Sequence, residues 1–428
     1  MRTLIKELKA GSKQQIAGFV EKVRDQKNIA FIILRDISSA IQVTVLKKEG
    51  DALTKSIEGL TPYSVIKVEG ELKQNPAVKL GGVEFMPSEI EVLSAAETPP
   101  IDEKSSIDQR LDYRWIDLRA PEKALIFKAQ TVLVDGMRRY LLDNGFVEMH
   151  SPKIISEPSE SGSDLFTVDY FGEKAYLAQS PQFYKQMGIA SGFERYFEIA
   201  PVFRAEKSFT NKHATEFTGF DVEFAYIDSY NDIMKLEEEM LVAGIKAVSE
   251  KYGTEIKELL NIEIEVPKLP FKRITLSEAA RILREQGQDI EDGDDLSTET
   301  ERALGEYMKA QGHEFYFVTD YPADIRAFYH MKDPKDQSKA LGYDLYFKGM
   351  EITTGAQREH RYEQLKTQAI SRGLTQEKIQ FYLDFFRYGC PPHGGFGIGV
   401  ERITMLLLGV PTIKEMQYIF RGPTRIKP

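Results

Sequence analysis

The pattern of apolar residues changes near residue 98, and this change constrains the fold more than any other feature of the chain. Before it, short runs of β-branched and apolar residues alternate with polar turns, which is the pattern of strands. After it, apolar positions recur at helical spacing over 120–144 and 228–252. Two adjacent prolines in 98–102 are typical of a linker. We therefore expect three parts: a β domain over 1–98, a linker or hinge over 99–125, and a larger mixed domain over 126–428.

The first 98 residues carry five candidate strands and one candidate helix. A short helix is predicted within 47–59, between the third and fourth strands. This order is typical of an OB-fold barrel, a module that commonly binds single-stranded nucleic acid. Many small β modules share this rhythm, so the order alone leaves the function open. The strands are predicted at 15–23, 29–35, 40–46, 63–72 and 82–93.

The larger part is predicted to combine long helices with strand-like runs. Pro121 favours a helix start near residue 120, and Gly253 is expected to end the helix that begins at 228. A further helix is predicted at 376–387. The segment 265–335, which includes two helix-like stretches, is expected to form an inserted subdomain.

Charge and composition exclude several classes of protein. The 56 basic and 66 acidic residues give a net charge of −10, which argues against a DNA-binding protein. The first 98 residues are close to neutral, so a local RNA contact stays possible there. No apolar run approaches the roughly 18–20 residues that a membrane span needs. The single cysteine, Cys390, cannot form an intrachain disulfide. With no evident targeting segment, we expect a cytoplasmic protein without a membrane partner.

A first cluster of reactive side chains follows a strand-like run that ends at Phe203. Arg204 and Glu206 come next, His213 follows a loop, and Phe217 lies on the returning run. Arginine and histidine can bind phosphates, the carboxylate can accept from an amino group, and the ring can stack on a base. These features suit a nucleotide. The alternative is a hairpin with surface ion pairs.

Two further clusters lie near the end of the chain. Glycines at 394–399 permit close backbone approach, and Arg402 follows in the first turns of a predicted helix. Asp344, Glu351 and Thr354 offer two carboxylates and a hydroxyl, which suit magnesium bound to phosphates. Each cluster taken alone has a structural alternative. The glycines and Arg402 could serve tight packing between a strand and a helix, and the two carboxylates could lie on a solvated acidic strand.

Together these clusters resemble the three motifs of the class II aminoacyl-tRNA synthetases. The segment 145–152, with Pro152, resembles the first motif, 203–217 the second and 397–402 the third. Their order behind an OB-like module resembles the subgroup for aspartate, asparagine and lysine. The resemblance implies an α+β fold, in which a five-stranded OB-fold barrel precedes a catalytic domain with a mainly antiparallel sheet flanked by helices. It also implies a homodimer that uses ATP, Mg²⁺ and tRNA.

The segment 179–186 resembles the aspartate-specific signature of that family. Ser180 and Pro181 start a helix well, and Lys185 lies four residues after Pro181 on the same face. The resemblance places Lys185 against the carboxylate of the substrate side chain. A neutral amide would leave a buried ammonium unpaired. The alternative for Lys185 is an exposed helix residue.

The resemblance also implies residue roles in the catalytic domain. It implies that catalysis rests on Arg204, Arg402 and Glu351. It implies ATP binding by Arg204, Glu206, His213, Phe217, Glu351, Gly399 and Arg402. It implies aspartate binding by Glu160, Ser180, Gln182, Lys185, Asp221, Thr354 and Arg358. It implies magnesium binding by Asp344, Glu351 and Thr354.

In the first module the resemblance implies contacts with the tRNA anticodon. The alternative for Phe31 is a place in the barrel core, which its spacing alone does not exclude. The expected reaction is ATP-dependent attachment of L-aspartate to tRNA(Asp) through an aspartyl adenylate, and whether tRNA(Asn) is also charged stays open. The rival interpretations are an asparaginyl enzyme, an inactive tRNA-binding paralogue, and an aspartate–asparagine metabolic enzyme on the same catalytic fold. The implied anticodon contacts are Arg24, Phe31, Gln42 and Glu84.

Overall fold

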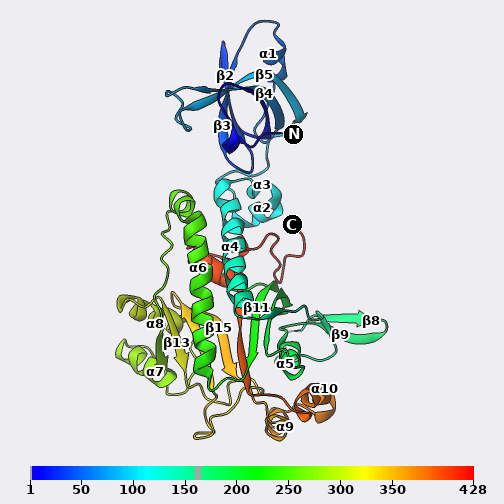
Figure 1. Cartoon of the computed structure of the whole chain (residues 1–428), viewed down its shortest axis with the longest axis vertical. Helices are drawn as coiled ribbons and strands as arrows, with labels where there is room; N and C mark the ends of the chain where they lie inside the picture. Colours follow the sequence, from blue (N-terminus) through cyan, green and yellow to red (C-terminus); the bar gives the residue numbers. More distant parts are fainter. Residues whose placement is uncertain (1, 160–164) are drawn as a thin grey trace. The chain divides into compact units, whose positions relative to one another are not determined.

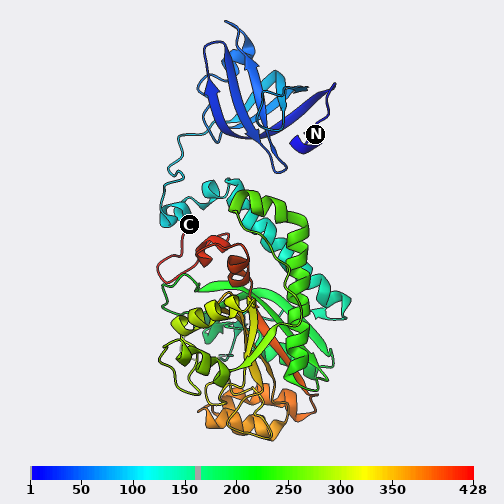
Figure 2. The same cartoon turned by 90° about the vertical axis from the view of Figure 1, so that its left-hand side faces the viewer.

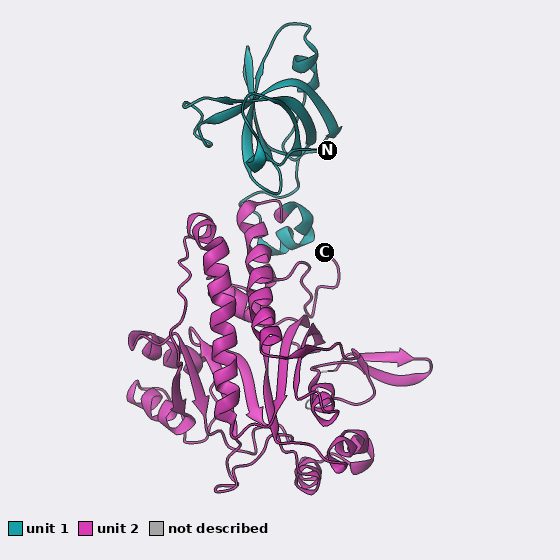
Figure 3. Ribbon diagram, in the orientation of Figure 1, with its two compact units in different colours: residues 1–116 teal, residues 117–428 magenta. Residues whose placement is uncertain are grey.

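The computed structural model describes residues 2–159 and 165–428. Contacts divide the chain into two compact units, Met1–Ile116 and Asp117–Pro428 (Figure 3). Each unit is described by itself below. Among the described residues, no helix is both long and apolar enough to cross a membrane.

The first unit is a closed five-stranded barrel with the strand order β1-β2-β3-β5-β4 (Figure 1). A short helix, α1 (Ala52–Ser56), lies between the third and fourth strands, as in an OB-fold. The predicted barrel is therefore confirmed. Two short helices, α2 (Ile107–Asp112) and α3 (Arg114–Asp117), follow it. The strands are β1 (Lys13–Asp25), β2 (Ile29–Arg35), β3 (Ala40–Leu46), β4 (Val65–Gln74) and β5 (Val83–Ser94).

Alternation along β2 decides which of its side chains form the barrel core. Ala30, Ile32 and Leu34 are fully buried inside the barrel. Phe31 alternates with them and is only partly buried, so it lies on the outer face. The interpretation of Phe31 as a core residue is therefore wrong.

The second unit is built on an eight-stranded sheet of order β12-β13-β14-β15-β16-β11-β10-β6. Its pairs are antiparallel except at the two ends, where β12 pairs with β13 and β10 pairs with β6 in parallel. A mainly antiparallel sheet with flanking helices was predicted and is confirmed. Its strands are β6 (Val147–Glu148), β10 (Arg195–Phe203), β11 (Glu216–Ala225), β12 (Lys272–Thr275), β13 (Phe315–Thr319), β14 (Gly342–Phe347), β15 (Met350–Gln357) and β16 (His393–Gly399).

Two long helices, α4 (Pro121–Asp143) and α6 (Tyr230–Leu260), run side by side against one face of this sheet (Figures 1 and 2). They touch through small residues: a Cβ built on Gly136 would lie 2.9 Å from the Cα of Gly244. The other helices are α5 (Gln182–Ala190), α7 (Leu276–Glu285), α8 (Thr298–Ala310), α9 (Tyr362–Ser371), α10 (Gln376–Arg387) and α11 (Val400–Leu407). A small separate sheet holds β7 (Ile154–Ile155), β8 (Thr167–Tyr170) and β9 (Glu173–Leu177).

The structure differs from the sequence prediction at the end of α6. The helix passes Gly253 and continues to Leu260, where Asn261 closes it in the left-handed conformation at φ 56°. Glycine costs about 1 kcal/mol in a helix interior. The fully buried side chain of Ile256, one turn later, offsets that cost. Local sequence therefore placed the helix end too early.

The segment 265–335 contributes to the main sheet. Its strands β12 and β13 extend that sheet from β14. Helices α7 and α8 pack on this edge and share one apolar cluster with Tyr316 and Val318 of β13. The segment thus widens the platform on which the cavity described below is built.

A buried carboxyl lies on the helix side of β14 and β15. Glu237 of α6 is fully buried, and one of its oxygens accepts from the Tyr343 hydroxyl at 2.6 Å. Within the described part of the chain, its other oxygen and the Thr353 hydroxyl have no hydrogen-bond partner. Burial, reinforced by the nearby carboxylates of Glu238 and Asp344, raises the pKa of Glu237 to about 8. The folded protein therefore holds this carboxyl in its neutral form at pH 7.

Replacing Glu237 with glutamine is expected to stabilise the protein, and more at pH 8 than at pH 5. A carboxyl whose folded-state pKa is raised contributes stability below its unfolded pKa, and this contribution is lost as pH rises toward the folded value. At pH 7 the loss is on the order of 3 kcal/mol. Urea unfolding of both proteins at the two pH values measures it. An equal difference between variant and parent at both pH values would contradict the assignment.

Candidate active site

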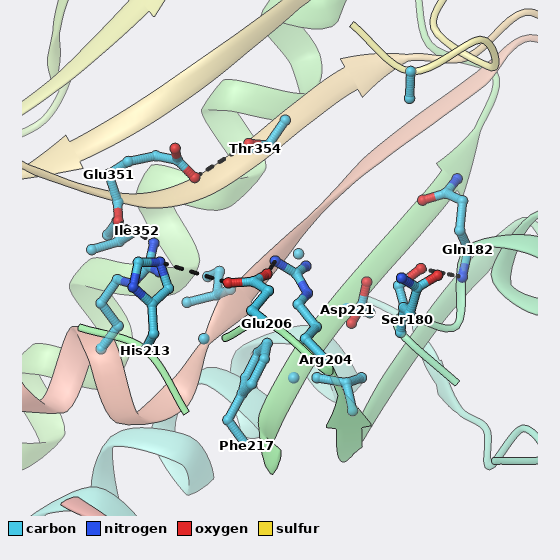
Figure 4. A pocket seen from close by; sticks show the side chains of 18 of the residues that line it. Ser180, Gln182, Arg204, Glu206, His213, Phe217, Asp221, Glu351, Ile352 and Thr354 are labelled. Atoms are coloured by element: carbon cyan, nitrogen blue, oxygen red, sulfur yellow. Dashed lines mark hydrogen bonds and ion pairs between the residues drawn. The ribbon is translucent and has the colours of Figure 1, made fainter. Parts of the chain in front are cut away.

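The second unit contains a cavity of about 300 Å³ at the ends of α5, β10, β11, β15 and β16 (Figure 4). It collects most of the residues that were predicted from sequences far apart in the chain. Asp344 does not line it, and Glu160 lies outside the described residues. The predicted residues that line it are Ser180, Gln182, Lys185, Arg204, Glu206, His213, Phe217, Asp221, Glu351, Thr354, Arg358, Gly399 and Arg402.

Strand pairing explains how these side chains meet. β10 and β11 pair so that Phe203 faces Glu216, which places Arg204 and the following loop at the end of the hairpin. β16 pairs with β11 on the other side, with Gly397 opposite Asp221. A Cβ on Gly397 would lie 2.9 Å from Asp221 Oδ1. The glycine therefore makes room for the carboxylate in the cavity.

At one end of the cavity, Lys185 is buried between two carboxylates of β11. Its Nζ donates to Asp221 Oδ1 at 3.0 Å and to the Phe396 carbonyl at 3.2 Å, and it lies 3.5 Å from Glu223 Oε2. The side chain is only 2% exposed. Lys185 is thus a buried cation of the cavity wall, and the interpretation as an exposed helix residue is wrong.

Glu223 is a charged residue of this site that the sequence interpretation missed. It accepts from Arg358 Nε at 2.9 Å and Nη2 at 3.3 Å. Burial alone would raise the pKa of the Glu223 carboxyl, but Arg358 and Lys185 hold it below its usual range. The signal was present, because acids two residues apart on a strand share one face. The cations Lys185 and Arg358 thus alternate with the anions Asp221 and Glu223. Arg358 Nη1 is the guanidinium nitrogen that takes no part in the hydrogen bonds to Glu223.

The amide of Gln182 is oriented by a chain of hydrogen bonds behind it. His393 Nδ1 lies 2.8 Å from the Pro391 carbonyl and therefore carries the proton, so its Nε2 accepts from Gln186 Nε2 at 2.9 Å. Gln186 Oε1 then accepts from Gln182 Nε2 at 2.8 Å and from the Tyr382 hydroxyl at 2.7 Å. Burial lowers the pKa of His393 to about 4, which keeps this polarity at neutral pH. The oxygen of the Gln182 side-chain amide therefore remains available to a ligand.

The opposite end of the cavity carries cations around an aromatic ring (Figure 4). The Arg204 guanidinium lies 5.4 Å from the centre of the Phe217 ring and 3.9 Å from Glu206. His213 Nδ1 lies 3.1 Å from the Ser208 hydroxyl and also contacts the Thr210 hydroxyl, while its Nε2 lies 3.9 Å from Glu206. Burial, with Arg402 nearby, lowers the pKa of His213. Neutral His213 can therefore donate one hydrogen bond to an anion.

Asp344, Thr354 and Glu351 meet on β14 and β15. The Thr354 hydroxyl lies 2.9 Å from Asp344 Oδ1 and 3.4 Å from Glu351 Oε1. Burial and the Asp344 charge raise the pKa of Glu351 to about 7. The described residues contain no group of three or more His, Cys, Asp or Glu side chains arranged for a metal. Two carboxylates and a hydroxyl nevertheless fit Mg²⁺ that takes its other ligands from phosphates and water.

Comparison with known families identifies the larger unit. Residues 106–420 match the family model described as tRNA synthetases class II (D, K and N). The chain belongs to this family. The smaller unit of this class II synthetase matches the OB-fold nucleic acid binding domain over residues 14–93.

Individual relatives of this class II synthetase cover nearly its whole length. The aspartate--tRNA(Asp) ligase of Thermococcus kodakarensis is 42% identical over 98% of this chain and 97% of its own. The aspartate--tRNA(Asp/Asn) ligase of Methanopyrus kandleri is also 42% identical, over 98% and 96%. The crystal structure of asparaginyl-tRNA synthetase from Pyrococcus horikoshii, complexed with asparaginyl-adenylate, superposes with a TM-score of 0.93 at 34% identity over the full length of both chains.

The barrel of this class II synthetase brings its four predicted contact residues to the outer face. Arg24 on β1 pairs with Phe31 on β2, and Phe31 pairs in turn with Thr44 on β3. Gln42 pairs with Glu84 across β3 and β5. The Thr44 hydroxyl links that pair, accepting from Gln42 at 3.1 Å and donating to Glu84 at 2.5 Å. An aromatic ring, a cation and an oriented amide–carboxylate pair thus lie on neighbouring strands.

Proposed function

We propose that this enzyme attaches L-aspartate to tRNA(Asp) in an ATP-dependent reaction. The observation that carries the proposal is the pair of buried cations, Lys185 and Arg358, at one end of the cavity. A substrate carboxylate placed there meets two charge-assisted donors, whereas an amide carries no charge to offset theirs and would turn its NH2 group toward a cation. The two curated relatives above, both aspartate ligases, support the same substrate.

The proposed first step joins aspartate to AMP. One oxygen of the aspartate α-carboxylate attacks the α-phosphorus of ATP in line, a P–O bond forms, and the bond to pyrophosphate breaks. Arg204 binds the α-phosphate, while His213 and Arg402 bind the γ-phosphate, and no protein nucleophile takes part. Catalysis then comes from position and from charge neutralisation. Mg²⁺ held by Asp344, Glu351 and Thr354 would neutralise phosphate charge.

The proposed second step transfers aspartate to RNA. The 3′-terminal hydroxyl of the tRNA attacks the carbonyl carbon of the aspartyl adenylate, AMP leaves with the electron pair of the broken C–O bond, and the hydroxyl proton passes to a phosphate oxygen of the leaving AMP. Gln182 supports the bound aspartate, because its carbonyl oxygen is turned toward the cavity by Gln186 and suits the substrate ammonium. We assign the adenine contacts to Phe217 and Glu206.

We also propose a cytoplasmic homodimer, on the basis of the family and of the segment 145–152. Burial raises the pKa of the Cys390 thiol to about 12, so it stays protonated and unreactive at neutral pH. The lone thiol is therefore consistent with a reducing compartment.

Size-exclusion chromatography with light scattering tests the proposed homodimer. A monomer at micromolar concentration would oppose it.

The test of the substrate is aminoacylation of separate tRNA(Asp) and tRNA(Asn) transcripts with radiolabelled aspartate or asparagine. Charging of tRNA(Asp) with aspartate supports the proposal. Charging of both transcripts with aspartate extends it to tRNA(Asn), the specificity that the name of the Methanopyrus kandleri relative gives. Charging only with asparagine would overturn it in favour of the function of the Pyrococcus horikoshii neighbour. No charging would favour an inactive tRNA-binding protein.

Replacing Phe31 with alanine is expected to weaken tRNA charging and leave adenylate formation nearly unchanged. Its ring lies on the outer face of the barrel between Arg24 and Thr44, where an unpaired base can stack on it. Such a stack is worth about 1–3 kcal/mol per base. We expect the KM for tRNA to rise at least about fivefold, since 1.4 kcal/mol is a factor of ten.

The control for this prediction is Ile33→Ala. Like Phe31, Ile33 lies on the outer-facing side of β2, but its side chain has no aromatic ring. Aspartate-dependent pyrophosphate exchange reports adenylate formation without tRNA. Equal losses of charging and exchange in the Phe31 variant would show that Phe31 acts through the fold instead of through RNA.

A further inference from the structure

Arg326 is a buried cation of the cavity for which the proposed reaction has no role so far. It lies in the loop after β13, lines the cavity, and its side chain is 11% exposed. Its guanidinium binds both oxygens of Asp344, from Nη1 to Oδ1 at 3.0 Å and from Nη2 to Oδ2 at 2.5 Å. It also lies 3.5 Å from the centre of the Tyr321 ring. Arg326 is thus the resident partner of a predicted metal ligand.

This pairing and a metal ion compete for the same oxygens. Mg²⁺ requires oxygen ligands at about 2.0–2.1 Å in octahedral geometry. Both oxygens of Asp344 already accept from the Arg326 fork, and Oδ1 accepts from Thr354 as well. A divalent cation at these oxygens would be in direct repulsion with the guanidinium. The ion pair therefore opposes metal binding at Asp344.

The guanidinium can move without moving its loop. Arg372, next to the end of α9, donates to the carbonyls of Ala323 at 2.6 Å and of Arg326 at 2.9 Å, and it also contacts the Asp324 carbonyl. The backbone of the loop is therefore fixed. By contrast, Arg326 Nε is buried and has no hydrogen-bond partner among the described residues. A rotation of the Arg326 side chain breaks its ion pair with Asp344. A new anionic partner can offset the free energy that is lost.

A triphosphate in the cavity would be that partner. The cavity that Arg326 lines is also lined by Arg204, His213 and Arg402, the residues assigned to phosphates. We propose that Arg326 is a displaceable counter-ion: it neutralises Asp344 in the free enzyme and yields this carboxylate to Mg²⁺ when ATP phosphates accept its guanidinium. This inference rests on the proposed function, because it assumes a nucleotide in this cavity. Metal alone then binds weakly, and metal and ATP bind cooperatively.

The test is the affinity of the enzyme for Mn²⁺ alone, measured from the electron paramagnetic resonance signal of free Mn²⁺ without ATP. Arg326→Gln keeps a polar side chain and removes the competing charge. We expect Mn²⁺ to bind about tenfold more tightly to this variant than to the parent, as for the removal of one charged hydrogen-bonded competitor. An unchanged or weaker Mn²⁺ affinity would overturn the proposal.

Two variants assign the effect. Asp344→Asn combined with Arg326→Gln should lose the gain, because the carboxylate that Mn²⁺ would occupy is gone; a gain that persists would place the metal elsewhere and overturn the proposal. Arg326→Lys offers a point charge instead of a fork and should give a smaller gain in the same direction. If the glutamine variant does not fold, the lysine variant decides, and an unchanged affinity there overturns the proposal.

A second measurement distinguishes a counter-ion from a merely structural residue. At saturating Mn²⁺, a non-hydrolysable ATP analogue should bind several-fold more weakly to Arg326→Gln than to the parent, because one phosphate partner is missing. If Mn²⁺ binds more tightly but the affinity for the ATP analogue is unchanged, the claim that Arg326 binds ATP phosphates is overturned. Neither measurement uses aspartate or tRNA, so a failed aminoacylation test and a failed counter-ion test are distinguishable.

Discussion

The variant Lys185→Ala should lose aspartate-dependent pyrophosphate exchange by about a hundredfold to a few thousandfold. The Lys185 side chain is 2% exposed, and its ammonium is held by Asp221 and the Phe396 carbonyl at one end of the cavity. Removing one partner of a buried ion pair costs about 3–5 kcal/mol, and each 1.4 kcal/mol is a factor of ten. Here the lost partner is also a proposed partner of the substrate carboxylate, so the loss falls on kcat/KM for aspartate.

The control for this prediction is Lys153→Ala. Lys153 also binds a buried carboxylate, Glu198 at 2.7 Å, but it does not line the cavity. This variant should lose stability and keep exchange within a few-fold of the parent. ATP binding, measured by calorimetry, should persist in the Lys185 variant. Exchange that survives in Lys185→Ala would remove this residue from the substrate site.

The fold could be predicted from sequence where local chemistry determines it. The predicted strands 29–35 and 40–46 coincide with β2 and β3, because β-branched residues alternate there between polar turns. The end of α6 could not be predicted, because the burial of Ile256 is a tertiary effect that outweighs the local signal of Gly253. The place of β12 at the sheet edge is likewise set by its pairing with β13, which is 40 residues away or more.

The candidate site shows the same division. Residue types and motif order were enough to select the side chains that line the cavity. The spacing from Asp221 could have pointed to Glu223, but the pairings themselves were not predictable, because they join distant segments: Glu223 meets Arg358 across 135 residues, and Gln186 meets His393 across 207. Arg326 was missed for a further reason. It lies in an irregular loop with no periodicity, and only the folded chain brings it to Asp344.

These partners change how the site works. A cavity that contained only the predicted residues would set the two cations Lys185 and Arg358 against the single carboxylate of Asp221. Glu223 and Asp221 neutralise both cations in the folded chain. The site is therefore stable without substrate, and an entering carboxylate binds to cations that are already held in place. This preorganisation lowers the cost of ordering them when aspartate binds.

The variant Arg204→Ala should lower kcat for pyrophosphate exchange by about a hundredfold to a thousandfold. Arg204 follows directly after β10, and its side chain is 44% exposed, 3.9 Å from Glu206 and 5.4 Å from the centre of the Phe217 ring. The Arg204 guanidinium is thus available to a ligand and is not held in a buried ion pair. Charge accumulates on the α-phosphate oxygens in the transition state, where one preorganised donor is worth about 10²–10³ in kcat. We expect KM for ATP to change far less, because the interaction strengthens only in the transition state.

A matched control separates this role from support of the strand. Arg195 begins β10 at its other end, donates to the Asn144 carbonyl at 2.6 Å, and does not line the cavity. Arg195→Ala should leave kcat near the parent value. The free energy of unfolding should fall by no more than about 0.5 kcal/mol in Arg204→Ala, as for an exposed side chain. A rise in KM with unchanged kcat would instead make Arg204 a ground-state contact, and the charge at the α-phosphate would then have to be neutralised by Arg402 and the metal alone.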